Sequence, residues 1–247
     1  MRWRRQVRRR LLRLSRRDAV KLPYSHLDLI ALAVFALCWF GYDWFATHRS
    51  GKRPSLLTVM NAARDRWFEQ TLTRENRIVD SALLSNLMNS ATFFSSTTVI
   101  ALGGLLALFG SVEKSAEIFE ALPFAQRSSQ QLIEAKVVLM ILLFIYALVK
   151  FTWSVRQFNF VTTLIGSIAP RDEVSELDKS AARRAGGILK LAGENFGQGM
   201  RAYYFAVAAM FWFVQPLFFI AATIVVTVML YRMEFHSRTL DVLSGNV

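Results

Sequence analysis

The sequence predicts an all-α polytopic membrane protein, with four transmembrane helices and two amphipathic polar helices on one side of the bilayer. The chain of 247 residues is 53% hydrophobic and only 19% charged, whereas a soluble domain has about 25% charged residues. Its apolar residues gather in four blocks and are not spread as in a globular core. Its mean hydropathy is positive although its 30 Lys and Arg exceed its 18 Asp and Glu. This combination is typical of a small inner-membrane protein, and we expect the chain in the inner membrane of a bacterium.

Each apolar block is long enough to cross a bilayer, whose hydrocarbon core of about 30 Å needs roughly 20 helical residues. The expected membrane helices are Leu27–Ala46, Ala91–Val112, Val137–Phe160 and Arg201–Tyr231. The third can continue as a helix to about Ala169 and would then project beyond the bilayer. In the fourth, Pro216 predicts a kink at mid-bilayer depth, because proline cannot donate to the carbonyl one turn earlier. An even number of crossings places both chain termini on one side.

Two polar segments between the blocks are expected to be helices on one side of the membrane. In residues 55–85, apolar residues recur at helical spacing after Ser55, which can cap the helix. Residues 173–196 repeat this pattern and place charged residues opposite the apolar face. Both segments lead directly into a membrane helix, while residues 113–135 form the short connection on the other side. The chain thus divides into a basic N-terminal extension (1–25), a membrane domain (26–238) and a C-terminal tail (239–247).

The basic extension carries ten Lys and Arg around an apolar helical face that includes Trp3 and Leu11. Such a helix suits a surface of anionic lipid, whereas nucleic acid, the other partner of basic arms, is not expected. The residues expected to face anionic headgroups are Trp3, Arg4, Arg5, Arg8, Arg9, Arg10, Arg16 and Arg17. Without the extension, Lys and Arg are enriched in the two long connections, which favours placing these in the cytoplasm. The extension's own charges balance that excess, so the orientation leans only slightly this way.

The sequence carries no standard catalytic signature. Its three histidines are widely separated, Cys38 is the one cysteine, and no HExxH, CxxC, P-loop or GxSxG motif occurs. Residues 197–202 read G-x-G-x-x-A, but the dinucleotide fingerprint needs a preceding strand, and here the motif joins a polar helix to a membrane helix. We expect its glycines to allow a bend or close packing. No catalytic residue, metal or cofactor is therefore expected.

Polar residues near the membrane helix ends are the best candidates for a site, because burying them unpaired is costly. Lys150 is either part of an ion or substrate path or a lysine that snorkels to the interface beside Trp153. The amides and hydroxyls that open the second helix either bond to neighbouring helices or form a polar site. The candidates are Asn86, Asn89, Ser95, Ser96, Lys150, Trp153, Arg156, Asn159, Asn195, Arg201, Tyr203, Tyr204 and Gln215. Five of them, Asn89, Arg156, Asn159, Asn195 and Arg201, are expected to converge at one membrane surface.

Small residues also recur on the second membrane helix. Gly103, Ala107 and Ser111 are spaced four apart, and such faces let helices approach closely in lipid. The predicted contact lies either within the bundle or between subunits.

Several blocks of the sequence together resemble a known membrane family. They are residues 64–67 (RDRW), 75–80 (ENRIVD), 83–110 (LLSNLMNSATFFSSTTVIALGGLLALFG), 150–160 (KFTWSVRQFNF) and 195–205 (NFGQGMRAYYF). The chain is similar through them to the bacterial branch of the family called domain of unknown function 599, over about Leu27 to Arg238. The resemblance implies a four-helix membrane protein with no assigned activity. The basic extension lies outside it.

We therefore expect an integral inner-membrane protein without catalysis, acting as an accessory, scaffold or oligomerising subunit. The alternative is a small ion or solute channel or carrier, which Lys150, the polar second helix and the Gln215–Pro216 pair favour. A lipid-headgroup enzyme comes third, because only Glu69, Glu75 and Asp80 beside arginines support it, and these are expected to form solvated helix pairs.

Overall fold

The computed structural model describes residues 25–48, 55–111 and 129–245, and these residues form helices and no strand. The helices are α2 (His26–His48), α3 (Leu56–Thr71), α4 (Ile78–Gly110), α6 (Gln130–Gly166), α7 (Glu176–Met210), α8 (Pro216–Phe235) and α9 (Arg238–Leu243), with short 3-10 turns η1 (Arg171–Glu173) and η2 (Phe211–Phe213). Four of them, α2, α4, α6 and α8, are long and apolar enough to cross a membrane. The predicted all-α class with four such helices is confirmed.

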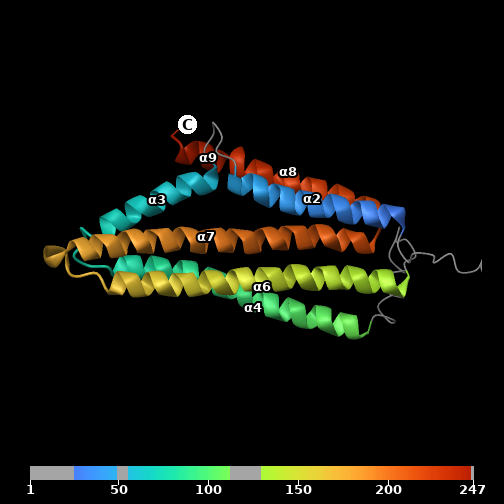
Figure 1. Ribbon diagram of the computed structural model, residues 1–247, viewed down its shortest axis with the longest axis horizontal. Helices are drawn as coiled ribbons and strands as arrows, with labels where there is room; N and C mark the ends of the chain where they lie inside the picture. The colour runs from blue at the N-terminus through green and yellow to red at the C-terminus, as the bar shows by residue number, and fades with distance from the viewer. Residues whose placement is uncertain (1–24, 49–54, 112–128, 246–247) are drawn as a thin grey trace, which may run out of the picture.

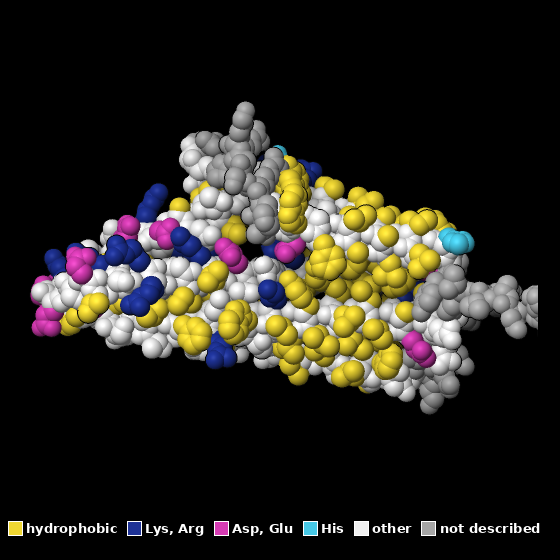
Figure 2. Space-filling model, in the orientation of Figure 1, with side chains coloured by type: hydrophobic (Ala, Val, Ile, Leu, Met, Phe, Trp, Pro, Cys, Tyr) yellow, Lys and Arg dark blue, Asp and Glu magenta, His cyan; other side chains and the backbone are white. Residues whose placement is uncertain are grey.

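The bundle is elongated because three of its helices continue far past the apolar region. At about 1.5 Å per residue, the 37 residues of α6 extend over about 55 Å, so this helix projects beyond a bilayer as expected. In Figure 1, α6 and α7 lie side by side over most of this length. Figure 2 shows the exposed hydrophobic side chains over one half of the molecule and most of the charged ones over the other. We call the charged half the projecting end and the opposite end, where α6 begins, the far end.

The first polar segment is not one helix over residues 55–85. Ser55 caps α3 by accepting from Thr58 N at 3.1 Å, as expected, but α3 ends at Thr71 and α4 begins at Ile78. Arg77 stabilises this break, because its guanidinium donates to Ile168 O at 2.8 Å and to Ala169 O at 2.7 Å. The second polar segment does continue into an apolar one, since α7 runs unbroken from Glu176 to Met210.

The predicted mid-bilayer kink at Pro216 is wrong, because the apolar run 201–231 is two antiparallel helices. The 3-10 turn η2 closes α7, and extended Gln215 (φ −165°, ψ 157°) precedes Pro216 at the start of α8. Proline is favoured there, since its missing N–H would have no helical partner at that position anyway. Gln215 therefore lies at the far end, not at mid-depth.

This hairpin changes the expected positions of the termini. At the start of α2, Asp28 accepts from Trp212 Nε1 at the end of α7, at 2.8 Å. At the end of α2, Phe45 packs on Phe235, the last residue of α8. The second half of α7 thus adds a fifth segment to the apolar region, and α2 begins at the far end while α8 finishes at the projecting end. Among the described residues, the first and last apolar helices therefore place the two ends of the membrane domain at opposite ends of the bundle, whereas the sequence predicted both termini on one side.

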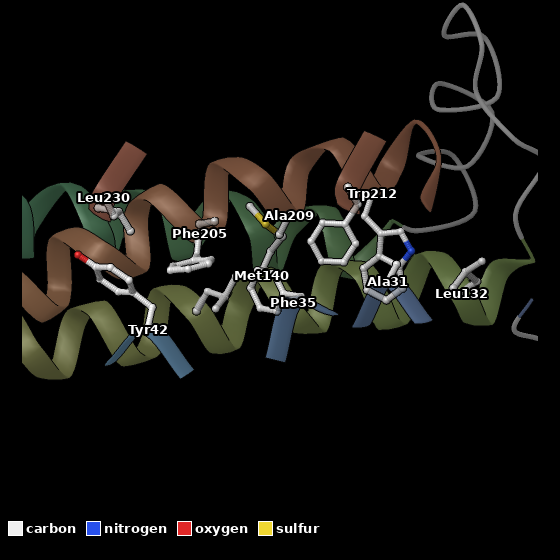
Figure 3. Close-up of a cluster of buried hydrophobic side chains, with 12 residues drawn as sticks. Ala31, Phe35, Tyr42, Leu132, Met140, Phe205, Ala209, Trp212 and Leu230 are labelled. Carbon is white, nitrogen blue, oxygen red and sulfur yellow. The ribbon is translucent and has the colours of Figure 1, made fainter. Parts of the chain in front are cut away.

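The apolar region is filled by aromatic side chains from α2, α7 and α8. Phe35 packs edge-on against Phe205 with ring centroids 5.6 Å apart and lies 5.1 Å from Phe219, which stacks on Trp212. Figure 3 shows Phe35, Met140 and Phe205 between Tyr42 and Trp212 along the helices. This packed column separates two groups of polar residues, one at each side of the apolar region.

Candidate functional site

The first polar group lies where the apolar region meets the projecting end, and its centre is an ion pair. Arg201 Nη2 of α7 donates to Asp43 Oδ1 of α2 at 2.8 Å, with side-chain exposures of 24% and 37%. Both residues come from apolar runs, where an unpaired charge is costly. The pair neutralises both charges and fixes α2 against α7.

A chain of amides continues this group between α6 and α7. Asn195 accepts from Lys150 Nζ at 3.3 Å and donates to Gln157 Oε1 at 3.0 Å. One turn away, the buried Ser154 hydroxyl donates to Ala192 O at 2.8 Å. Lys150 also lies 5.5 Å from the centroid of the Tyr146 ring. Lys150 therefore links α6 to α7 through Asn195. We call Asp43, Lys150, Gln157, Asn195, Gln198 and Arg201 the polar layer.

The polar layer encloses a small cavity beside the ion pair. Its walls are Trp39, Tyr42, Asp43, Tyr146, Gln198, Arg201 and Phe205, and its volume is about 10 Å³. Gln198 Oε1 is buried and has no hydrogen-bond partner among the described residues. The space is about that of one water molecule, so the cavity can hold a water or a bare ion and excludes an organic substrate.

Glycines of α7 let other helices approach this layer closely. A Cβ on Gly199 would lie 2.6 Å from Phe151 Cε1, and one on Gly193 would lie 2.6 Å from Arg64 Nη2. The expectation that the G-x-G-x-x-A segment allows close packing is confirmed at Gly199. Arg64 lies outside the membrane segments, and its burial lowers the pKa of its guanidinium while Glu194 opposes this shift.

A second polar group, at the far end, was missed by the sequence analysis. Asp28 and Lys136 are each only 3% exposed, and Lys136 Nζ lies 5.7 Å from the ring centroid of Trp212, the indole that donates to Asp28. One signal could have revealed this group: the opposite charges Asp28 and Lys136 each stand at the start of an apolar run. Asp28 lies 15 residues along α2 from Asp43, a distance of about 22 Å. The two polar groups therefore lie on either side of the apolar layer.

Asp80, at the projecting end, was expected to form a solvated helix pair, but it does not. It is fully buried, accepts from Trp67 Nε1 at 2.6 Å and pairs with Arg74. These contacts join α4 to α3, so the role of Asp80 is structural. Glu75 is solvated as expected but forms no helix pair: it lies between α3 and α4 and makes an exposed ion pair with Arg171 of η1 at 3.1 Å.

The five polar residues do not converge as predicted: Asn195 bonds to Lys150 and Gln157, whereas Arg201 pairs with Asp43. Arg156 and Asn159 are exposed on the opposite face of α6 from buried Gln157, and the Arg156 guanidinium lies 5.7 Å from the rings of Trp153 and Phe160. Asn89 is exposed on α4. Helical phase explains the error, because residues at one depth can face opposite directions.

The other candidate residues do not lie together in one site. Tyr203 lies deeper, and its hydroxyl is 2.7 Å from Thr98 Oγ1. Tyr204 packs partly buried against the aromatic column. Asn86 and Ser96 are exposed on α4, and Ser95 is half-buried. The lipid-facing set in the basic extension lies outside the described residues. Among the described residues, no group of three His, Cys, Asp or Glu side chains could hold a metal ion.

Comparisons with known proteins give one match. Residues 30–239 match the family model described as Protein of unknown function, DUF599. No curated protein and no solved structure is similar enough to the chain to match it.

Proposed function

The chain belongs to the DUF599 family of proteins of unknown function, and we propose that it is a non-catalytic accessory or scaffold subunit of the bacterial inner membrane. It assembles with copies of itself or with another membrane protein, and its projecting helices bind partners. Anionic lipid headgroups hold the basic extension.

The observation that carries this proposal is the exposed outer face of α4. Only 11% of the most apolar 18-residue stretch of α4 is buried, against 39% for α6. Gly103, Ala107 and Ser111 are all exposed, and a Cβ on Gly103 would meet nothing within 4 Å. Among the described residues, Gly103 therefore makes no close helix contact within the bundle. This favours a contact between subunits, where small residues allow close helix packing.

The packed interior favours a scaffold over a channel formed by one chain. Between the two polar groups lie Phe35, Phe205, Phe219 and Trp212, and each of them is less than 5% exposed. An ion crossing this layer would have to pass about 20 Å of closely packed and largely aromatic side chains.

The alternative, a small ion or solute channel or carrier, is favoured by the cavity of the polar layer. Gln198 lines space for about one water or ion beside Asp43 and Arg201, and its Oε1 has no hydrogen-bond partner among the described residues. For this function, the aromatic column would have to open.

The orientation that we propose keeps the two long connections in the cytoplasm. The antiparallel hairpin moves the C-terminal Arg232 and Arg238 to the side of these connections, which strengthens the excess of positive charge there.

Two measurements on the full chain separate the two functions. Native mass spectrometry in mild detergent should give a defined oligomer or one stoichiometric protein partner, and proteoliposomes should show no ion flux above protein-free controls. A monomer that conducts ions, and loses conduction in Arg201→Ala, would support the channel and contradict the scaffold.

A further inference from the structure

A groove runs between α2 and α8 on the outside of the apolar region. Its volume is about 410 Å³, and it is lined by Leu37, Cys38, Gly41, Tyr42, Phe45, Thr227, Val228 and Tyr231. Gly41 opens the groove, because it is exposed and a Cβ at this position would meet nothing within 4 Å. The volume is within the range of about 300–1,000 Å³ that small-molecule sites occupy.

A second hollow lies on the neighbouring face of α8 and reaches to the end of this helix. It shares Val228 with the first, has a volume of about 560 Å³, and is lined by Ile224, Val225, Val228, Met229, Arg232, Met233, His236 and Ser237. The described residues that line the two hollows are therefore largely apolar. At the end of α8 the lining is basic, because Arg232 and His236 lie there one helical turn apart.

The basic end lies at the depth of the polar layer. Phe45, two residues after Asp43, packs against Tyr231, next to Arg232, with ring centroids 6.1 Å apart. Arg232 is exposed and has no ion pair among the described residues. The nearest acid along α8, Glu234, already accepts from Leu57 N at 3.0 Å. Within the described part of the chain, Arg232 is thus a cation that no carboxylate pairs with, at the boundary of the apolar region.

We propose that this groove binds an anionic phospholipid of the bilayer. One acyl chain lies along the seam of α2 and α8 over Gly41, and the phosphate is bound by the Arg232 guanidinium with His236 beside it. The exposed Arg232 at the edge of an apolar trough matches a headgroup beside its own chain, because phosphate and guanidinium pair through charge-assisted hydrogen bonds. An apolar helix of another protein would give this cation no anion, so the charge favours the lipid.

Photolabelling of the full chain in bilayers tests this site separately from the basic extension. The probe is phosphatidylglycerol with a diazirine on its acyl chain, and labelled residues are mapped by mass spectrometry. We expect labels to concentrate on residues 37–45 and 224–233. Gly41→Leu should remove most of these labels, because the new side chain fills the trough. Gly104→Leu is the matched control on α4, where a Cβ also meets nothing within 4 Å, and should leave them unchanged.

The headgroup contact is tested by comparing this probe with a zwitterionic phosphatidylcholine probe. Arg232→Gln should lower the preference for phosphatidylglycerol about fivefold, the equivalent of about 1 kcal/mol for one basic residue at an anionic surface. Arg238→Gln, on α9 and outside the groove lining, should not. Labels spread evenly over the outer faces of α2, α4, α6 and α8, or a wild-type groove that does not distinguish the two lipids, would overturn the proposal.

Discussion

Arg201 and Asp43 are 158 positions apart in the sequence and form the ion pair that joins α7 to α2, with Nη2 2.8 Å from Oδ1. The pair lies at the boundary of the apolar region, where water screens it less than at an exposed surface. Each partner keeps the other from being an isolated charge near lipid.

Removing both members of this pair should destabilise the protein by less than the two single removals added together. Asp43→Asn leaves the Arg201 charge partly buried, and we expect a loss of about 1–3 kcal/mol. The double variant Asp43→Asn with Arg201→Gln should lose less than the sum of the two single variants. Thermal unfolding of the four proteins in one detergent measures this. Strictly additive losses would mean that the two side chains do not interact.

Glycine substitutions in α7 should differ according to what faces them. Gly199→Ala places a Cβ 2.6 Å from Phe151 Cε1, and such overpacking costs about 1–3 kcal/mol. Gly187→Ala on the same helix meets nothing within 4 Å and should be neutral or stabilising by about 0.5–1 kcal/mol, because alanine favours helix. Equal melting temperatures for the two variants would show that α7 does not pack on α6 in this register.

The α7–α8 hairpin fixes the expected topology of the chain. Reporters placed after residues 50, 185 and 247 should all report one side of the membrane, and reporters at the N-terminus and at residue 125 should report the other. If the fusion at 247 instead agrees with the one at 125, the run 201–231 is a single crossing and the hairpin is wrong.

The loop before α7 should contribute less to the stability of the fold in acid than at neutral pH. Asp178 accepts from Ala169 N at 2.9 Å and Ser175 N at 2.8 Å, and hydrogen bonds from Ser175 and Ala169 lower the pKa of its carboxyl to about 2. A carboxyl with a lower pKa in the folded state stabilises the fold above its unfolded pKa of about 3.9. Its contribution is therefore complete at neutral pH and is lost as the pH falls from about 4 towards 2.

The difference in unfolding midpoint between wild type and Asp178→Asn measures this contribution. It should be constant above about pH 5 and shrink below about pH 4. A difference that does not change between pH 6 and pH 3 would rule out the carboxylate as its source.

Helix type and membrane character were predictable from local pattern, whereas the pairing of helices was not. The run 201–231 contained an unused signal, since at 1.5 Å per residue it is about 46 Å long, too long for one crossing of about 30 Å. Asp28 and Asp43 stand near the two ends of the apolar run 27–46, but their partners Trp212 and Arg201 come from distant segments. Asn89 and Arg156 failed as site residues because depth follows from position in the sequence, whereas the direction of a side chain depends on which face its helix buries.

The proposal that the outer face of α4 is an assembly surface can be tested directly by disulfide cross-linking in native membranes. Cys38 is the one cysteine of the chain, so Cys38→Ser gives a cysteine-free background. In this background Ala107→Cys should form a disulfide-linked dimer or one discrete adduct on mild oxidation. Val225→Cys, on α8 and 65% exposed, should stay monomeric. Cross-linking that is absent at both positions, or equal at both, would contradict assembly through α4.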